Sequence, residues 1–106
     1  MEKRETARTR KRTTVRYGVD AAERMAFTQN LSEAGVKVRT HRVFRPGTRL
    51  YLELKFPDRS FALRGRVAWA KTVPPQLAHV VDCGMGIRFL DPPDDWDEYY
   101  RTLAAR

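Results

Sequence analysis

The sequence predicts an all-β fold with one helix: a small six-stranded antiparallel β-barrel capped by a short C-terminal α-helix. Three observations carry this prediction. Apolar and polar residues alternate through most of the chain, turn signals separate the alternating runs, and a helical period occurs only near the C-terminus. The length of 106 residues provides for one hydrophobic core and not for two. We therefore expect one barrel domain over residues 13–106, preceded by a flexible basic arm over residues 1–12.

The six strands follow in chain order from the alternation. The first two are expected in TTVRYG (residues 13–18) and RMAFTQN (24–30), joined by a short connection at residues 20–23. Further strands are expected around residues 36–39, 50–56, 61–70 and 85–89, and the turn PDRS makes a hairpin of the fourth and fifth. In the fifth strand, one face consists of Phe61, Leu63, Gly65, Val67 and Trp69. This alternation favours a core position for Trp69.

The helical period begins after the sequence DPP. One helix face consists of Trp96, Tyr99, Tyr100 and Leu103, at positions i, i+3, i+4 and i+7. Asp94 or Asp95 is expected to cap the first turn, and the surrounding acidic residues favour the positive end of the helix dipole. The one long connection, residues 72–84, contains two consecutive prolines and is expected to be an extended loop.

Charge and cysteine content limit the class of protein. The formal net charge is +8, and seven cations lie in the first sixteen residues, so an anionic partner is expected. Five acidic residues within residues 91–98 argue against a surface that binds nucleic acid uniformly. Without a signal-peptide stretch or an apolar run long enough for a membrane span, we expect a cytoplasmic protein. The single cysteine, Cys83, is expected to be a buried, inert thiol, and no metal site is expected.

The segment NLSEAG, residues 30–35, combines three kinds of chemistry. Asn30 and Ser32 are two positions apart, so an extended backbone presents an amide and a hydroxyl on one face. Gly35 permits either a positive φ or the close approach of a flat group. Taken alone, Asn30 and Ser32 are also typical of residues that satisfy the backbone of an ordinary turn.

Arg-x-x-x-Arg followed by Asn-x-Ser-x-x-Gly resembles the signature of PilZ domains. The stretches FRPGTRLYLELKFPD, GRVAWAK and GMGIRFLDP also resemble the central hairpin and last strand of that family, in the same order. The resemblance implies a PilZ-type barrel that binds cyclic di-GMP, a bacterial second messenger. It also implies that two arginines of the arm grip guanine edges and phosphates, while Asn30, Ser32 and Gly35 form the binding motif on the barrel. Asn30 replaces the Asp of many members, and Ala34 stands where a second Gly is frequent.

Three overlapping arginine pairs fit the spacing: Arg4 with Arg8, Arg8 with Arg12, and Arg12 with Arg16. In the family the second arginine directly precedes the first strand, and two strands and a turn must fit before the Asn. Twenty-two positions separate Arg8 from Asn30 but only fourteen separate Arg16 from it, so we assign the pair to Arg4 and Arg8. Arg12 is an additional or alternative member. The planar fork of arginine matches the O6 and N7 acceptors of guanine, and Trp69 is a possible stacking platform.

The resemblance therefore implies a cyclic di-GMP receptor or adaptor in second-messenger signalling, and we do not expect an enzyme. The arm would order over the barrel on ligand binding and change a surface that an unidentified partner protein reads in trans. His41 and His79 have no recognisable nucleophile arranged with them, no phosphate-cradling Gly-rich loop is present, and no cofactor is expected. Two alternatives remain. One is a nucleic-acid-binding small barrel, supported by Lys37, Arg39, Arg64 and Arg66 beside Tyr51; the other is a PilZ-like interaction module that binds no nucleotide.

Overall fold

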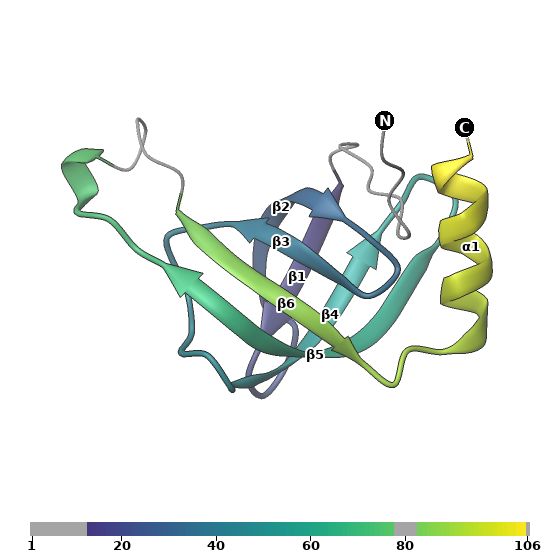
Figure 1. The fold of residues 1–106 in the computed structure, drawn as a ribbon, viewed down its shortest axis with the longest axis horizontal. Coiled ribbons are helices and arrows are strands. Elements are labelled where there is room, and N and C mark those ends of the chain that lie inside the picture. The colour runs from purple at the N-terminus through teal and green to yellow at the C-terminus, as the bar shows by residue number, and fades with distance from the viewer. Residues whose placement is uncertain (1–12, 78–82, 106) are drawn as a thin grey trace, which may run out of the picture.

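A computed structural model describes residues 13–77 and 83–105 of the protein (Figure 1). The elements are strands β1 (Thr14–Gly18), β2 (Arg24–Leu31), β3 (Gly35–Arg39), β4 (Arg49–Lys55), β5 (Ser60–Lys71) and β6 (Gly84–Leu90), a 3₁₀ turn η1 (Pro75–Leu77) and helix α1 (Asp94–Ala104). All six predicted strands and the predicted helix are therefore present in their predicted order. The basic arm, which we assigned to residues 1–12, lies outside the described residues.

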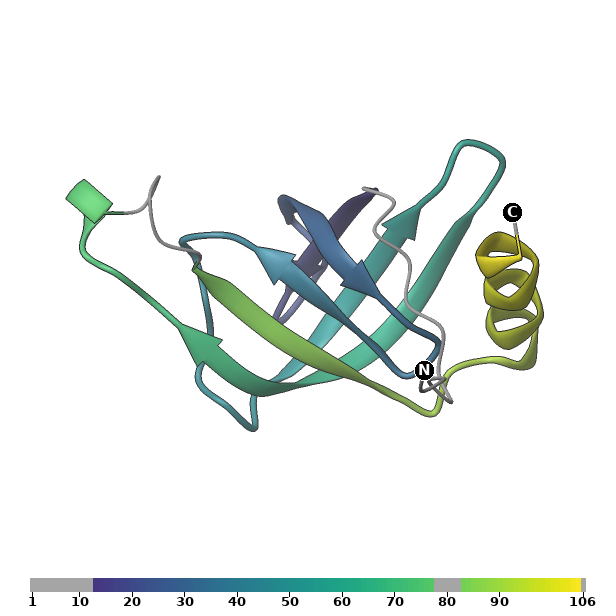
Figure 2. The same cartoon turned by 45° about the horizontal axis from the view of Figure 1, so that its top comes forward.

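The six strands form a closed antiparallel barrel in the order β1-β2-β3-β6-β5-β4, which confirms the predicted fold class. Pairing of β1 with β4 closes the sheet. The hairpin of β4 and β5 is also confirmed, and β5 is long enough to pair with β4 on one side and β6 on the other (Figure 2). Closure leaves the sheet without an unpaired edge strand.

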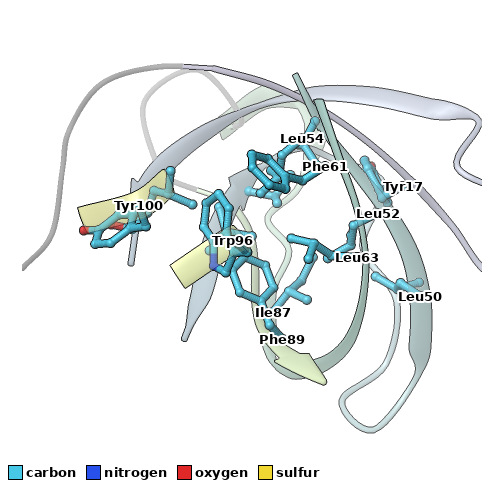
Figure 3. Close-up of a cluster of buried hydrophobic side chains, with 14 of the residues drawn as sticks. Tyr17, Leu50, Leu52, Leu54, Phe61, Leu63, Ile87, Phe89, Trp96 and Tyr100 are labelled. Carbon is cyan, nitrogen blue, oxygen red and sulfur yellow. The ribbon is translucent and has the colours of Figure 1, made fainter. Parts of the chain in front are cut away.

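The barrel interior is filled by the apolar half of each alternating run. Leu50, Leu52 and Leu54 of β4 are at most 2% exposed, as expected for residues that share one face of a strand. Helix α1 lies at one end of the barrel and extends this core with Trp96, Tyr100 and Leu103 (Figure 3). Trp96 is fully buried, with ring centroids 5.2 Å from Phe61 and 5.6 Å from Phe89. Burial of these aromatic rings fixes the helix on the barrel.

Two local predictions around α1 and η1 are wrong. The helix begins at Asp94, so Pro93 occupies the N-cap position and no side chain caps the first turn. The predicted acidic first turn is present, with Asp94, Asp95 and Asp97 inside it. The connection after β5 is not wholly extended, because the Leu77 N–H donates to the Pro74 carbonyl at 2.9 Å and forms η1. Proline at the first helical position is compatible with such a turn, since its φ is already near helical values.

Cys83 is 3% exposed, which confirms the predicted buried thiol. Its Sγ lies 3.3 Å from Nδ1 of His41. Within residues 13–77 and 83–105, no group of three or more His, Cys, Asp or Glu residues is arranged to hold a metal ion. In the same part of the chain, no helix is sufficiently long and apolar to cross a membrane.

Candidate functional site

A groove of about 430 Å³ lies on the outer surface of the barrel, over β2, β3, β6 and β5. Its polar and aromatic lining comes from Asn30, Ser32, Lys37, Trp69 and Arg88, with bare backbone at Gly35 and Gly86. The three motif residues on the barrel therefore line the same groove. Two interruptions of regular strand pairing bring Asn30 and Trp69 to this groove.

The first interruption is a register shift in β2. Thr28 pairs with Val38 and Asn30 pairs with Lys37, so Gln29 is an extra residue on β2. In a regular strand, Asn30 would share the inward face of Thr28, which is 2% exposed. The extra residue reverses the alternation, because a shift of one position moves each side chain to the other face. Asn30 consequently lines the outer groove.

The second interruption is a register shift in β5. Val67 pairs with Ile87 and Trp69 pairs with Gly86, so Ala68 is the extra residue. Val67 is 1% exposed, whereas Trp69 is 44% exposed and lines the groove. The favoured core position of Trp69 is therefore wrong, because the alternation that places it with Val67 does not continue through the shift. Because the indole is exposed, Trp69 can instead serve as a stacking platform for a flat ligand.

Gly86 explains where the Trp69 ring rests. A Cβ atom at position 86 would lie 2.2 Å from Nε1 of Trp69, so only glycine leaves room for the indole on the β6 backbone. The Lys37 Nζ lies 5.8 Å from the centroid of the same ring, within range of a cation–π interaction. Trp69 is thus held in a defined position beside a cation.

Strand pairing arranges these residues in one row across four neighbouring strands. Asn30 pairs with Lys37, Lys37 pairs with Gly86, and Gly86 pairs with Trp69. With strands about 4.8 Å apart, the row extends roughly 14 Å. An amide, an ammonium group, a bare peptide backbone and an indole therefore follow one another along the groove.

Ser32 and Gly35 shape the turn at one end of this row. Ser32 Oγ accepts hydrogen bonds from the N–H groups of Ala34 at 3.3 Å and Gly35 at 3.2 Å. Ser32 therefore satisfies turn backbone groups, as residues of its type commonly do, while also lining the groove. Gly35 does not have a positive φ, so that alternative is wrong. Its missing Cβ permits a close approach of β3 to β6 instead, because that atom would lie 2.4 Å from the Ile87 carbonyl oxygen.

The Asn30 side-chain amide has no hydrogen bond to any other residue in the described parts of the chain. An amide offers two donor hydrogens and one acceptor oxygen. Asn30 can therefore form hydrogen bonds to a ligand without first giving up an internal one.

The first described residue, Thr13, is bonded to Thr28, two residues before Asn30. The Thr28 N–H donates to the Thr13 carbonyl at 2.9 Å, and the Thr13 N–H donates to Thr28 Oγ1 at 3.1 Å. From this point β1 runs away from the groove, since Arg16 pairs with Met25 of β2 and Glu53 of β4. The predicted ligand arginines Arg4, Arg8 and Arg12 lie outside the described residues.

Arg88 and Gly86 are groove residues that the sequence does not single out, and Lys37 is singled out only in support of the nucleic-acid alternative. Arg88 is an outward-facing residue of β6 that pairs with Gly35 of the motif. Arg66 is its partner on the other side and itself pairs with Arg49. The alternation of GMGIRF indicates that Arg88 faces outward, but only strand pairing shows which groove it lines.

A second groove of about 870 Å³ lies over the beginning of β4, the first part of β5 and the end of β6. Its walls include Val19, Tyr51, Arg64, Leu90 and Arg49. Tyr51 is 47% exposed and pairs with Arg64, so this groove also combines an aromatic ring with arginine. It contains two of the residues on which the nucleic-acid alternative depends.

Comparison with known proteins agrees with this architecture. The PilZ domain family model matches residues 2–104. The chain belongs to the PilZ domain family. Among solved structures, this PilZ domain is similar to one titled "Structure of Bacillus subtilis Inhibitor of motility (MotI/DgrA)", with a TM-score of 0.74 and 19% sequence identity. The match covers 100% of this chain and 54% of that one, so this chain spans about half the length of that protein. No curated protein sequence matches it.

Proposed function

We propose that this PilZ domain is a receptor for cyclic di-GMP that binds the ligand in the groove over β2, β3, β6 and β5. The observation that carries the proposal is the row from Asn30 through Lys37 and Gly86 to Trp69. Two separate register shifts turn Asn30 and Trp69 outward into one groove. Bulges of this kind re-aim side chains at functional sites.

The groove chemistry suits a cyclic purine dinucleotide. Cyclic di-GMP carries two phosphates and two guanine bases. Lys37 and Arg88 supply positive charge for the phosphates, and the supported indole of Trp69 supplies a flat surface for a guanine. The Asn30 amide can pair with a base edge or a ribose, because it both donates and accepts.

The arm supplies the remaining recognition in this proposal. Arg8 is five residues before Thr13, a distance of at most about 17 Å for an extended chain. Thr13 lies against Thr28, two residues before Asn30, so an arm folded back from this point reaches the groove. Arg4 and Arg8 then direct their guanidinium forks at guanine O6 and N7 or at phosphate, with Arg12 as the alternative member. Arg16 is less suited, since its strand leads away from Asn30.

Ligand binding would be read as a change of surface. When the arm covers the groove, it places ordered chain over the exposed indole and the groove cations, and a partner protein can distinguish the two states. The similar structure is titled an inhibitor of motility, which is a regulatory role. We propose a regulatory role for this chain as well, that of an adaptor acting in trans.

Calorimetric titration with cyclic di-GMP of the wild-type protein, Arg8→Ala and Arg16→Ala tests the proposal and the arginine assignment together. Loss of a bidentate arginine contact worth about 1–3 kcal/mol should weaken binding of Arg8→Ala by roughly ten- to hundredfold. Arg16→Ala should bind as the wild type does. Equal binding by all three proteins contradicts the arginine assignment, and absence of wild-type binding contradicts the receptor function. Linear dinucleotide and ATP serve as ligands that should not bind.

One observation favours the nucleic-acid alternative. Arg49, Arg66 and Arg88 are consecutive cross-strand neighbours, although like charges in such positions repel one another. A row of arginines is suited to a phosphate backbone. Binding of this kind falls steeply with salt, by orders of magnitude for a protein with many phosphate contacts, so titration of single-stranded and duplex DNA at two salt concentrations distinguishes it from guanine recognition.

A further inference from the structure

Helix α1 is joined to the binding motif by two hydrogen bonds from buried aromatic side chains. Tyr100 Oη donates to the Leu31 carbonyl at 3.1 Å, and Trp96 Nε1 donates to the Glu33 carbonyl at 3.1 Å. Leu31 and Glu33 are the residues immediately before and after Ser32. The helix therefore contacts the backbone of the motif itself, from the side that faces the core.

These two bonds hold peptide groups that determine where the motif side chains point. The Leu31 carbonyl belongs to the peptide that leads into Ser32, and the Glu33 carbonyl belongs to the peptide that leads into Ala34. Inside the turn, the Ser32 N–H donates to the Gly35 carbonyl at 2.9 Å, and Ser32 Oγ adds only long hydrogen bonds of 3.2–3.3 Å. The helix thus provides a second support for the turn, from below the groove.

The helix is itself well anchored, so the support is rigid. Trp96 is 0% and Tyr100 is 1% exposed, and their ring centroids lie 5.9 Å apart (Figure 3). The hairpin between β4 and β5 holds the outer side of the helix through an Arg59–Asp95 ion pair of 3.0 Å and a hydrogen bond of 2.6 Å from Tyr99 Oη to Asp58. Side chains locked by packing and by second contacts can hold a binding geometry that a turn alone would not hold.

We infer that Tyr100 and Trp96 are positioning residues for the groove, and that ligand binding at the motif and docking of helix α1 stabilise each other. This inference rests on the proposed function and deepens it. If the docked helix favours the binding geometry of the turn, the bound ligand must favour the docked helix by the same factor, because coupling between two binding equilibria is reciprocal. Helix α1 is then a second part of the surface, after the arm, that reports whether ligand is bound.

Two conservative substitutions separate positioning from general stability. Tyr100→Phe removes the hydroxyl donor to Leu31 and keeps the ring. Tyr17→Phe is the matched control, since Tyr17 is also 1% exposed and its hydroxyl bonds Thr40 Oγ1 at 2.8 Å and the Arg42 carbonyl at 2.9 Å. Neither Thr40 nor Arg42 lines the groove.

Both variants should lose thermal stability, but only Tyr100→Phe should bind cyclic di-GMP more weakly, by about three- to tenfold, which is the effect of one hydrogen bond. Trp96→Phe, which removes the other donor, should weaken binding in the same direction. Equal affinities for Tyr100→Phe and Tyr17→Phe would overturn the inference, provided both variants remain folded in the melting curves.

The two tryptophan indole N–H signals in an NMR titration of the wild-type protein distinguish coupling from binding. Trp69 lines the groove, so its signal reports binding of cyclic di-GMP, and Trp69→Phe identifies it. Trp96 is fully buried and its Nε1 donates to the Glu33 carbonyl, so a shift of its signal reports an effect transmitted from the groove to the helix. Shifts of both signals are expected. A shift of the Trp69 signal without the Trp96 signal overturns the coupling and leaves the receptor function intact, whereas no shift of either overturns the receptor function.

Discussion

The two grooves on the barrel both combine cations with an aromatic ring but differ in backbone structure. The groove that carries the motif combines Trp69 with Lys37 and Arg88, and the second groove combines Tyr51 with Arg49 and Arg64. The second groove has about twice the volume, 870 against 430 Å³. Size alone would therefore favour the second groove over the one that carries the motif, although Asp91 in its lining offsets one of its two arginines.

The pairing register of the strands distinguishes the two grooves. Between β4 and β5, pairing continues without a shift from Arg49 opposite Arg66 to Lys55 opposite Ser60. The motif groove instead has shifts in both β2 and β5 and bare backbone at two glycines, whereas no glycine is among the described residues that line the second groove. The comparison indicates that an amide and an aromatic ring reach the same row where strand pairing is interrupted, and the proposed binding site lies there.

The largest expected effect tests the support of the aromatic ring. In Gly86→Val, the new side chain occupies the space of the Trp69 indole, since a Cβ there would be 2.2 Å from Nε1. Loss of base stacking worth about 1–3 kcal/mol should weaken cyclic di-GMP binding by roughly ten- to hundredfold in calorimetry. Ala62→Val, an exposed wall residue of the second groove, is the control and should bind normally. Unchanged binding by Gly86→Val would mean that Trp69 is not a stacking platform.

A smaller effect is expected from removing single arginines of the two grooves. Arg88→Ala should weaken cyclic di-GMP binding by about tenfold, since a hydrogen bond to a charged group contributes roughly 1.5–3 kcal/mol. Arg64→Ala removes the same charge from β5 in the second groove and should leave affinity unchanged. If both variants lose affinity equally in a fluorescence titration, net charge and not the particular groove determines binding.

The smallest effect is expected at the amide. Asn30→Ala removes a neutral hydrogen-bonding group that is not bonded to other described residues, so stability should change little. Affinity for cyclic di-GMP should fall by about two- to tenfold. Gln29→Ala, at the extra residue of the same bulge, is a useful comparison because Gln29 does not line the groove. Calorimetry on both variants, together with melting curves, checks this prediction, which fails if Gln29→Ala has the larger effect on affinity.

Several features of the site were predictable because they are local. The alternation of the motif segment and the Asn-x-Ser-x-x-Gly spacing indicated that Asn30 and Ser32 belong to one surface, and the structure places both in one groove. Cys83 and the aromatic face of α1 followed from burial tendency and helical period, and both predictions are confirmed. The assignment of the ligand arginines to Arg4 and Arg8 stays a prediction.

Trp69 shows why other features were not predictable. The rule that alternate residues share a face fails at one extra residue, and nothing in FALRGRVAWA marks Ala68 as that residue. The glycine that accommodates the indole is seventeen positions away in the sequence and belongs to another strand. The predicted N-cap at Asp94 or Asp95 is wrong because of a small difference in the position of the helix start. The helix begins at Asp94, one residue earlier than a cap at Asp94 requires.

The sequence by itself determined the number and order of the strands, the single amphipathic helix, the burial of the core and the family, because each follows from short-range period or from a motif within one segment. Tertiary structure alone decided which outward residues meet. The row from Asn30 to Trp69 and the bonds from Tyr100 and Trp96 to the motif join segments from 39 to 69 positions apart. Such contacts depend on the pairing register of β2, β3, β6 and β5, which is a property of the closed barrel and not of any one strand.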